Sequence, residues 1–181
     1  MTQVAPLEVS GVRLKLRLVR PDDAAYIHAL RTDAAYNAHL SAVTGTVEDQ
    51  RHWIEAYKRR EAEGVEYYYV VERLDDARRC GLVRLYEIEN EHFTWGSWIL
   101  DKNKPSKAAL ESAVLSFGIG FGQLEKTVAK IDVRQENSHA TTFYRRFGMV
   151  ETGRDMLNIY FDYTRERYET DREEHLAVLK E

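Results

Sequence analysis

Apolar and charged residues alternate strictly along residues 128–134, which predicts a strand that is covered on one face only. The apolar positions are Ala129, Ile131 and Val133, and the charged positions are Lys130, Asp132 and Arg134. After the polar pair at 137–138, apolar residues recur with the i, i+3, i+4 and i+7 spacing of one helix face. They are Ala140, Phe143, Tyr144 and Phe147. Gly148 then ends the helix, because glycine readily adopts the left-handed conformation that follows one.

The same patterns predict the other strands and helices. The remaining predicted strands cover residues 11–20, 66–72, 80–88 and 93–100, and a last one after Gly153 carries Leu157, Ile159 and Phe161. Short turns make the middle three an antiparallel meander. Helices begin at Pro21, at Thr46 with Asp49 as a capping pair, and at Ser106 as N-cap. Their inner faces are Ala24, Ile27 and Leu30; Gln50, Trp53, Ile54 and Tyr57; and Leu110, Ala113, Val114, Phe117 and Phe121.

Three further segments complete the picture of one mixed α/β domain over residues 1–181, with its core at 11–163. Residues 33–45 have no sustained period and predict a loop. The glycine-rich run 118–122 lies at the end of a helical pattern, so it indicates helix termination rather than a dinucleotide-binding fingerprint, which follows a strand. The charge-rich tail 164–181 either forms a short packed helix or remains irregular.

Composition narrows the possible functions. Apolar residues make up 44% and charged residues 31% of the 181 residues, as in a globular protein. The net charge of −4 gives no indication of nucleic-acid binding, which needs a basic field. A single cysteine excludes an internal disulfide or a multi-thiolate metal site. Without an apolar run or a signal-peptide pattern, we expect a cytoplasmic protein with no membrane contact and no metal.

The stretch 128–149 resembles the second half of the coenzyme-A site in the GNAT superfamily of N-acetyltransferases, and the likeness extends over residues 11–163. The resemblance implies a mixed, mostly antiparallel sheet that is splayed between its fourth and fifth strands and flanked by helices. It also implies transfer of acetyl from acetyl-CoA to a primary amine. The start LKLRLVRPDD resembles the ribosomal-protein and sugar acetyltransferase branch. The strands EYYYVV, VRLYEI and FTWGSWIL are similar to nucleotide-linked amino-sugar enzymes of that branch.

The resemblance assigns coenzyme-binding roles. Backbone amides of Ile99 and Leu100 would hold the thioester carbonyl, and Tyr144 would return a proton to the sulfur. Asn137 matches a position that often contacts the coenzyme, although a lone asparagine there is also a helix cap. The phosphate loop departs from the family because it has no glycines. Its small and basic residues still suit phosphates, and the alternative is weaker coenzyme binding or a loop of altered shape. The residues expected to bind the coenzyme here are Lys104, Ser106, Lys107, Ala108 and Ala109.

The acceptor side is less defined by sequence. Glu87, at the end of a strand beside GSWIL, is the favoured general base, although a lone carboxylate there is more often a strand-end charge. The expected acceptor-site residues are His39, Tyr67, Trp95 and Trp98, with core packing as the alternative for the two tryptophans. The expected acceptor is a nucleotide-linked amino sugar. A protein amino terminus and a non-catalytic coenzyme-binding module are the alternatives, and a homodimer is one arrangement that the sequence leaves open.

Overall fold

The computed structural model describes residues 4–39 and 43–181. Within these ranges, eight strands form one sheet in the order β1-β2-β3-β4-β5-β6-β8-β7, in which every pair is antiparallel except β5–β6. The strands are β1 (Glu8–Ser10), β2 (Leu14–Leu18), β3 (Tyr67–Arg73), β4 (Arg79–Tyr86), β5 (His92–Leu100), β6 (Val128–Arg134), β7 (Val150–Arg154) and β8 (Asn158–Thr164).

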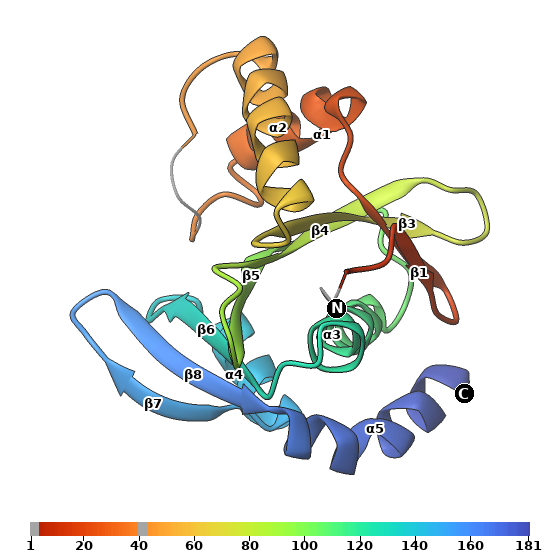
Figure 1. Cartoon of the computed structure of the whole chain (residues 1–181), viewed down its shortest axis with the longest axis vertical. Coiled ribbons are helices and arrows are strands. Elements are labelled where there is room, and N and C mark those ends of the chain that lie inside the picture. Colours follow the sequence, from red (N-terminus) through yellow and green to blue (C-terminus); the bar gives the residue numbers. More distant parts are fainter. Residues whose placement is uncertain (1–3, 40–42) are drawn as a thin grey trace.

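Helices cover both faces of this sheet (Figure 1). They are the 3₁₀ turn η1 (Pro21–Asp23), α1 (Ala24–Thr32), α2 (Val47–Ala62), α3 (Ala108–Gly118), the π-helical turn η2 (Ile119–Gln123), α4 (Ser138–Phe147) and α5 (Arg165–Lys180). Helices α1 and α2 pack on one face, and α3, α4 and α5 contribute to the core on the other. The chain therefore has the layered α/β architecture expected from its sequence.

Local signals set most helix boundaries. Thr46 caps α2 by accepting the amide of Asp49, and the Asp49 carboxylate accepts the amide of Thr46, so the expected capping pair is confirmed. Asn137 caps α4 by accepting the amide of Ala140 at 3.2 Å. Gly148 ends that helix with φ 106°, as expected.

The structure differs from the sequence-based expectations at several boundaries. Strands β1 and β7 were not predicted, because the first has only three residues and the second has no buried residue. The predicted fourth and fifth strands are consequently β5 and β6. Helix α3 begins at Ala108, and its N-cap is Lys107 with φ 62°, so the expectation of Ser106 as N-cap is wrong. The tail is the helix α5, in which Tyr168 and Leu179 are buried.

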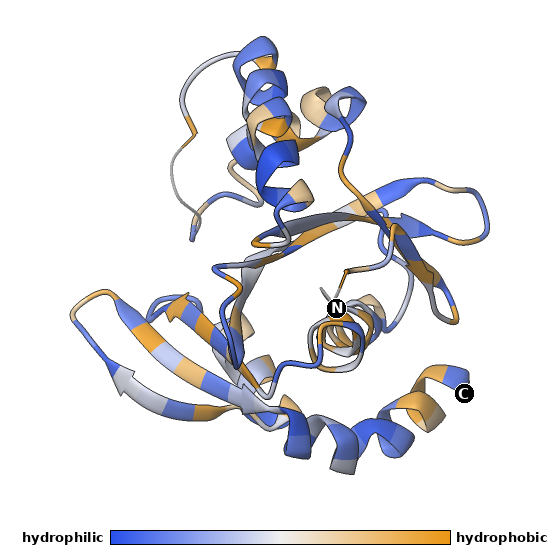
Figure 2. Ribbon diagram, in the orientation of Figure 1, coloured by the Kyte–Doolittle hydropathy of each residue, from blue (hydrophilic) through white to orange (hydrophobic). Residues whose placement is uncertain are grey.

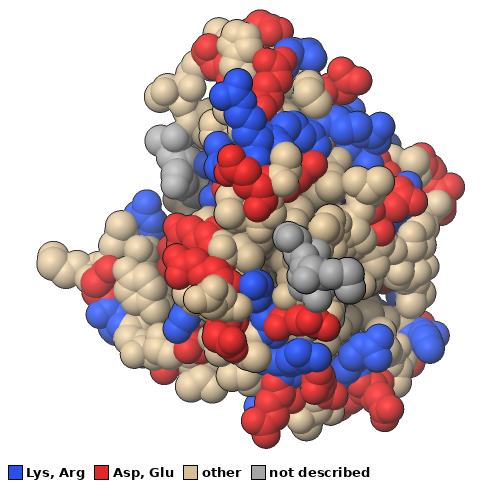
Figure 3. Space-filling view, in the orientation of Figure 1, with Lys and Arg blue, Asp and Glu red and all other residues tan. Residues whose placement is uncertain are grey.

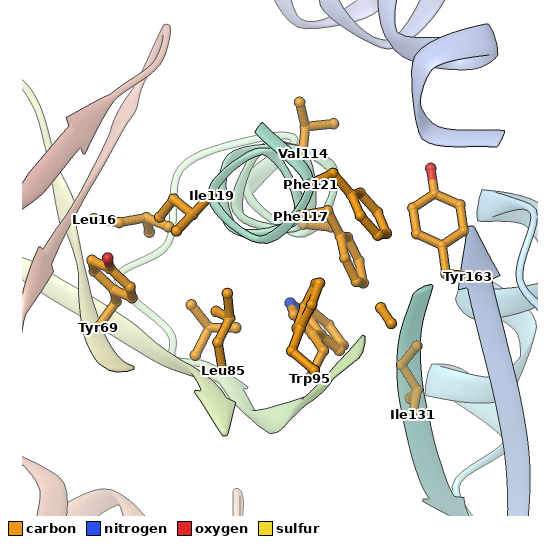
Figure 4. Close-up of a cluster of buried hydrophobic side chains, with 14 of the residues drawn as sticks. Leu16, Tyr69, Leu85, Trp95, Val114, Phe117, Ile119, Phe121, Ile131 and Tyr163 are labelled. Atoms are coloured by element: carbon orange, nitrogen blue, oxygen red, sulfur yellow. The ribbon is translucent and has the colours of Figure 1, made fainter. Parts of the chain in front are cut away.

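The glycine-rich run continues α3 as a π-helical turn rather than ending the helix at once. Gly120 lies against Phe93 of β5, where a Cβ would be 2.2 Å from the ring. The glycine is therefore required by this close approach. Around it, aromatic side chains of α3 and the turn pack between the sheet and α5 (Figure 4). Helices α2 and α5 are mostly hydrophilic along their length, consistent with surface positions (Figure 2).

A buried ionic cluster joins β2, η1 and β3. Arg17 donates to both carboxylate oxygens of Asp23 at 2.8 Å and to Glu72 at 2.6 Å. Burial alone would raise the pKa of Asp23, but hydrogen bonds from Arg17 and from the Arg20 amide outweigh it and lower that pKa. Asp23 therefore stabilises the fold in its ionised form.

Candidate active site

The central feature of the candidate site is the divergence of β5 from β6. These two strands pair in parallel only through His92–Thr94 and Val128–Lys130. Beyond this point β5 pairs with β4 alone, and β6 pairs with β8 over its whole length. The facing edges of the two strands thus separate from residue 95 onward, which leaves room for a ligand between them. This is the splay that was expected between the fourth and fifth predicted strands.

A bulge bends β5 at the start of this gap. The register between β4 and β5 shifts between the pairs Leu82–Ile99 and Arg84–Gly96, so that β5 has one residue more than β4. Ser97 lies in this bulge and has φ 50°, a left-handed conformation that non-glycine residues adopt infrequently. The bulge increases the local twist and directs the end of β5 away from β6.

The ladder on the other edge of β5 fixes the direction of its amides. The amide of Asp101 donates to the carbonyl of Cys80 at 2.8 Å, so this residue faces β4. In an antiparallel pair the backbone amides of alternate residues point to the partner strand, so the amide of Ile99 also points to β4. Its carbonyl is indeed close to Gly81, where a Cβ would lie 2.4 Å from it. The amide of Leu100 faces the gap, whereas the expectation that Ile99 offers its amide there is wrong.

A cavity of about 300 Å³ lies in the gap. Its walls come from β5, β6, the loop after α1, the start and middle of α4, and the start of β8. The lining residues are Tyr36, His39, Gly96, Ser97, Trp98, Asp132, Val133, Arg134, Asn137, Tyr144, Leu157 and Asn158. Four residues that the sequence pointed to therefore meet here: His39, Trp98, Asn137 and Tyr144.

Tyr144 is the most enclosed polar side chain of the cavity. It is 6% exposed, and its ring contacts Trp95, Trp98 and Phe161. Its hydroxyl makes no hydrogen bond to another residue in the described part of the chain. Burial raises the pKa of Tyr144, and the negative charge of Asp132 raises it further. The phenol is consequently protonated at neutral pH and able to donate into the cavity.

The loop after α1 is held beside the gap by two tyrosines. Tyr26 donates to the Asp101 carboxylate at 2.7 Å, and the Tyr36 hydroxyl accepts the amide of Lys102 at 3.1 Å. These bonds tie α1 and its loop to the end of β5. His39 is thereby brought to the cavity wall, although it is itself exposed. The expected loop 33–45 extends across residues 40–42, which lie outside the described residues.

Two carboxylates compete as the group that meets an acceptor amine. Glu87 is exposed, accepts a hydrogen bond from the Thr94 hydroxyl at 3.2 Å, and is not part of the cavity wall. Asp132 is in the cavity wall, as is His39. Sequence reasoning missed Asp132, although the strict alternation of β6 had already placed it on the face opposite to the core. The geometry favours Asp132 over Glu87.

The other aromatic candidates divide between core and cavity. Trp95 has no exposed surface, and its indole N–H donates to the Ser116 hydroxyl at 2.8 Å. Tyr67 is 2% exposed in the same core. Neither is available to an acceptor, so core packing was the correct interpretation for Trp95, and the expectation that Tyr67 meets the acceptor is wrong. Trp98 remains a candidate, with its N–H bonded to Ser112 at 3.0 Å and its ring at the cavity wall.

The expected phosphate loop lies at the start of α3. Lys104 and Ser106 are exposed, and Ala108 and Ala109 begin the helix, whose first amides have no partner within it. Lys107 does not extend toward an external ligand. Its ammonium donates to the carbonyl of Val178 at 2.6 Å and lies 3.9 Å from Glu181, at the end of α5. The loop therefore fits phosphates through Lys104, Ser106 and the helix amides, without the Lys107 side chain.

Positions 4–39 and 43–181 contain no group of three or more His, Cys, Asp or Glu side chains that could hold a metal ion. Within the same ranges no helix is long and apolar enough to cross a membrane. Acidic and basic side chains are interspersed over the face shown in Figure 3.

Comparisons with known proteins agree with this geometry. A family model described as an acetyltransferase (GNAT) domain matches residues 13–150. Among solved structures, the chain is similar to apo FdhC, described as a nucleotide-linked sugar GNAT. The identity is 34% over 93% of this chain and 96% of that chain, with a TM-score of 0.87. A search of curated protein sequences gave no significant match.

Two more distant structures share the fold. One is spermidine N-acetyltransferase from Vibrio cholerae in complex with CoA and spermine, with 20% identity over 86% of this chain and 98% of that one, and a TM-score of 0.75. The other is ribosomal-protein-S5-alanine acetyltransferase from Vibrio fischeri, with 12% identity over 90% and 99%, and a TM-score of 0.77. At these identities the likeness extends to the fold alone.

Proposed function

Because the chain belongs to the GNAT family of acetyl-CoA-dependent acetyltransferases, we propose that it acetylates the amino group of a nucleotide-linked amino sugar. The observation that carries the proposal is the cavity between β5 and β6, because its wall contains both the protonated phenol of Tyr144 and the carboxylate of Asp132. The acceptor class is supported by the 34% identity to a nucleotide-linked sugar enzyme. Membership of this enzyme family argues against the alternative of a non-catalytic module.

The residues of the gap suit the coenzyme. Acetyl-CoA supplies the acetyl group as a thioester. In our proposal the coenzyme lies along the edge of β5, as an additional strand would, and the backbone amide of Leu100 donates a hydrogen bond to it. The amides at the start of α3, with Lys104 and Ser106, hold the phosphates. Asn137 stays the cap of α4 and thereby positions the helix that carries Tyr144.

Tyr144 and Asp132 carry the proton transfers in this proposal. The Tyr144 hydroxyl keeps its proton until a thiolate leaves, because its pKa is raised above its ordinary value of 10.0. A thiol has an ordinary pKa of about 8.5, below that of the phenol, so this proton transfer is uphill and needs direct contact with the departing thiolate. The tyrosinate that it leaves regains a proton from solvent before the next cycle. Asp132 orients the acceptor ammonium and accepts its proton, and water reaches this exposed side chain to carry the proton away.

The acceptor enters from the face that α1, its loop and β4 form. Trp98 gives this entrance an apolar wall, and His39 gives it a polar rim. A sugar ring suits such a mixed lining, because its faces are apolar and its edge carries hydroxyl groups. Apolar lining with a few placed polar groups is the usual composition of small-molecule sites.

The test is release of free thiol from acetyl-CoA across a panel of acceptors. The panel contains nucleotide-linked amino sugars, free amino sugars, spermidine and a peptide with an alanine amino terminus, and each product is identified by mass spectrometry. We expect the highest kcat/KM with a nucleotide-linked amino sugar and a mass increase of one acetyl group. Acetylation of the peptide or of spermidine alone would contradict the proposed acceptor, and no thiol release with any amine would contradict the activity.

A further inference from the structure

A second cavity, of about 420 Å³, lies on the same face of the sheet as the acceptor entrance. It is bounded by the end of α1, the loop before α2, the first turns of α2 and strand β4. Two arginines belong to its wall, Arg31 from α1 and Arg84 from β4, together with Trp53 and Gln50. Nothing in the reaction described above uses this cavity.

Arg84 keeps hydrogen-bonding capacity in this position. Its side chain is 17% exposed, and its guanidinium lies 3.9 Å from the centre of the Tyr86 ring. The buried Nε atom has no hydrogen-bond partner within residues 4–39 and 43–181. The nearest carboxylate, Glu66, is 3.9 Å away, beyond hydrogen-bond distance, and is closer to Arg60 at 3.2 Å. Arg84 is thus held in place by stacking while its charge is incompletely compensated.

The charges of Arg31 and Arg84 both influence the buried phenol of Tyr68, so the two guanidinium groups lie near each other. Tyr68 is 1% exposed between β3 and the helices, and burial raises the pKa of its phenol. The charges of Arg31 and Arg84 both oppose that rise. The one carboxylate in the cavity wall, Asp49, already accepts the backbone amide and the hydroxyl of Thr46. The cavity therefore favours an anion.

This cavity adjoins the one between β5 and β6. Arg84 pairs directly with Gly96 across β4 and β5, and neighbouring strands are about 4.8 Å apart. Gly96 lines the first cavity and Arg84 lines the second. The loop after α1 also contributes to both, with Tyr36 and His39 at the first and Thr44 at the second. One extended ligand can therefore reach both cavities along a single face.

We propose that the second cavity binds the diphosphate of the acceptor, with phosphate oxygens accepting hydrogen bonds from Arg31 and Arg84. The inference rests on the proposed function and deepens it. Guanidinium groups suit phosphate oxygens, because their planar donors can bind two oxygens at once. A nucleotide-linked amino sugar then has its ammonium beside Asp132 and its diphosphate beside the arginines. A polyamine lacks the anionic part and meets two like charges instead.

The experiment measures binding of uridine diphosphate and thymidine diphosphate to the whole protein by calorimetry, with and without saturating CoA. We expect at least one of them to bind, with CoA present as well as absent, and Arg84→Gln to weaken binding about 10-fold to 100-fold. Arg31→Gln, from α1, should give a similar loss. Arg165→Gln, which removes an exposed arginine of α5, should bind as the wild type does.

Several results would overturn the inference. One is that neither diphosphate binds, and another is that wild type and Arg84→Gln bind equally well. A third is loss of binding when CoA is present, because this would place the anion in the coenzyme site. Acetylation of a free amino sugar as fast as its nucleotide-linked form would overturn it too, while leaving the acetyltransferase activity in place. Conversely, arginine-dependent diphosphate binding without acetylation of any amine would sustain this inference and contradict the proposed function.

Discussion

Replacement of Tyr144 by phenylalanine isolates the hydroxyl that the proposed chemistry depends on. The hydroxyl has no hydrogen bond to a described residue, so its removal breaks none and leaves the ring contacts with Trp95, Trp98 and Phe161 in place. We expect the free energy of unfolding to change by less than about 1 kcal/mol. For a domain of this size that corresponds to a shift in Tm of less than about 4 °C.

The effect on catalysis should be far larger. A positioned general acid contributes about 10²-fold to 10⁴-fold to a rate, which is roughly 3–5 kcal/mol of activation free energy. We therefore expect kcat of Tyr144→Phe to fall by at least about 100-fold in the thiol-release assay. The KM for acetyl-CoA should change little, because the phenol holds a proton for the leaving thiolate and does not hold the coenzyme.

The control is Tyr163→Phe, which makes the same chemical change elsewhere. Tyr163 is fully buried among the core aromatics, and its hydroxyl has no partner within the described residues. It is not part of the cavity wall, so its kcat should equal that of the wild type. A kcat of Tyr144→Phe within about threefold of the wild type, or an equal loss in Tyr163→Phe, would show that the Tyr144 hydroxyl is not the general acid.

The pH dependence gives an independent check on the same group. Burial raises the pKa of Tyr144, so the phenol stays protonated across the range in which an acceptor amine loses its proton. For an amine with pKa of about 8, kcat/KM should rise with pH and reach a plateau that extends to about pH 10. A decline of kcat/KM between pH 8 and 9 in the wild type that is absent from Tyr144→Phe would contradict a raised pKa.

Three further predictions concern the carboxylate and the fold. Asp132→Asn should lower kcat/KM for the acceptor about 100-fold with little change in the KM for acetyl-CoA, as initial rates will show. Gly120→Ala should lower the free energy of unfolding by about 1–3 kcal/mol, because its Cβ would meet the Phe93 ring at 2.2 Å, whereas Gly122→Ala has no atom within 4 Å of its new Cβ and should not destabilise the protein in urea titrations. Asp23→Asn should cost about 3–5 kcal/mol, since it removes one of the two carboxylates that pair with the buried Arg17 and leaves only Glu72. Because the pKa of Asp23 is lowered in the folded state, its stabilisation is present above its ordinary value of 3.8 and is lost as pH falls further. In thermal unfolding scans, the difference in Tm between wild type and variant should therefore stay constant from pH 6 to about pH 4 and narrow as the pH falls below that.

The order of strands and helices followed from periodicity because most elements here are amphipathic. Strand β6 shows this best, since its alternating burial matches its alternating sequence. Periodicity could not predict strand β7, because no residue in it is buried. Lys107 shows a different limit. Its left-handed conformation and its bond to Val178 depend on α5, which is distant in sequence.

The candidate site was predictable where local motif and position coincide, as at Tyr144 and Asn137. It was not predictable where the outcome depends on which side of a strand faces a partner. Ile99 and Leu100 are neighbours with similar side chains, and only the register with β4 separates their amides. Glu87 and Asp132 are likewise equivalent as carboxylates in the sequence, and the position of the cavity distinguishes them.

A crystal structure of the protein with CoA would show whether Tyr144 can protonate the leaving thiolate, because it measures the distance between the coenzyme sulfur and the Tyr144 hydroxyl. We expect the pantetheine to lie between β5 and β6, beside the Leu100 amide, with the sulfur within about 3.5 Å of that hydroxyl. A coenzyme bound elsewhere, or a sulfur that faces away from Tyr144 with the cavity between the strands empty, would contradict it.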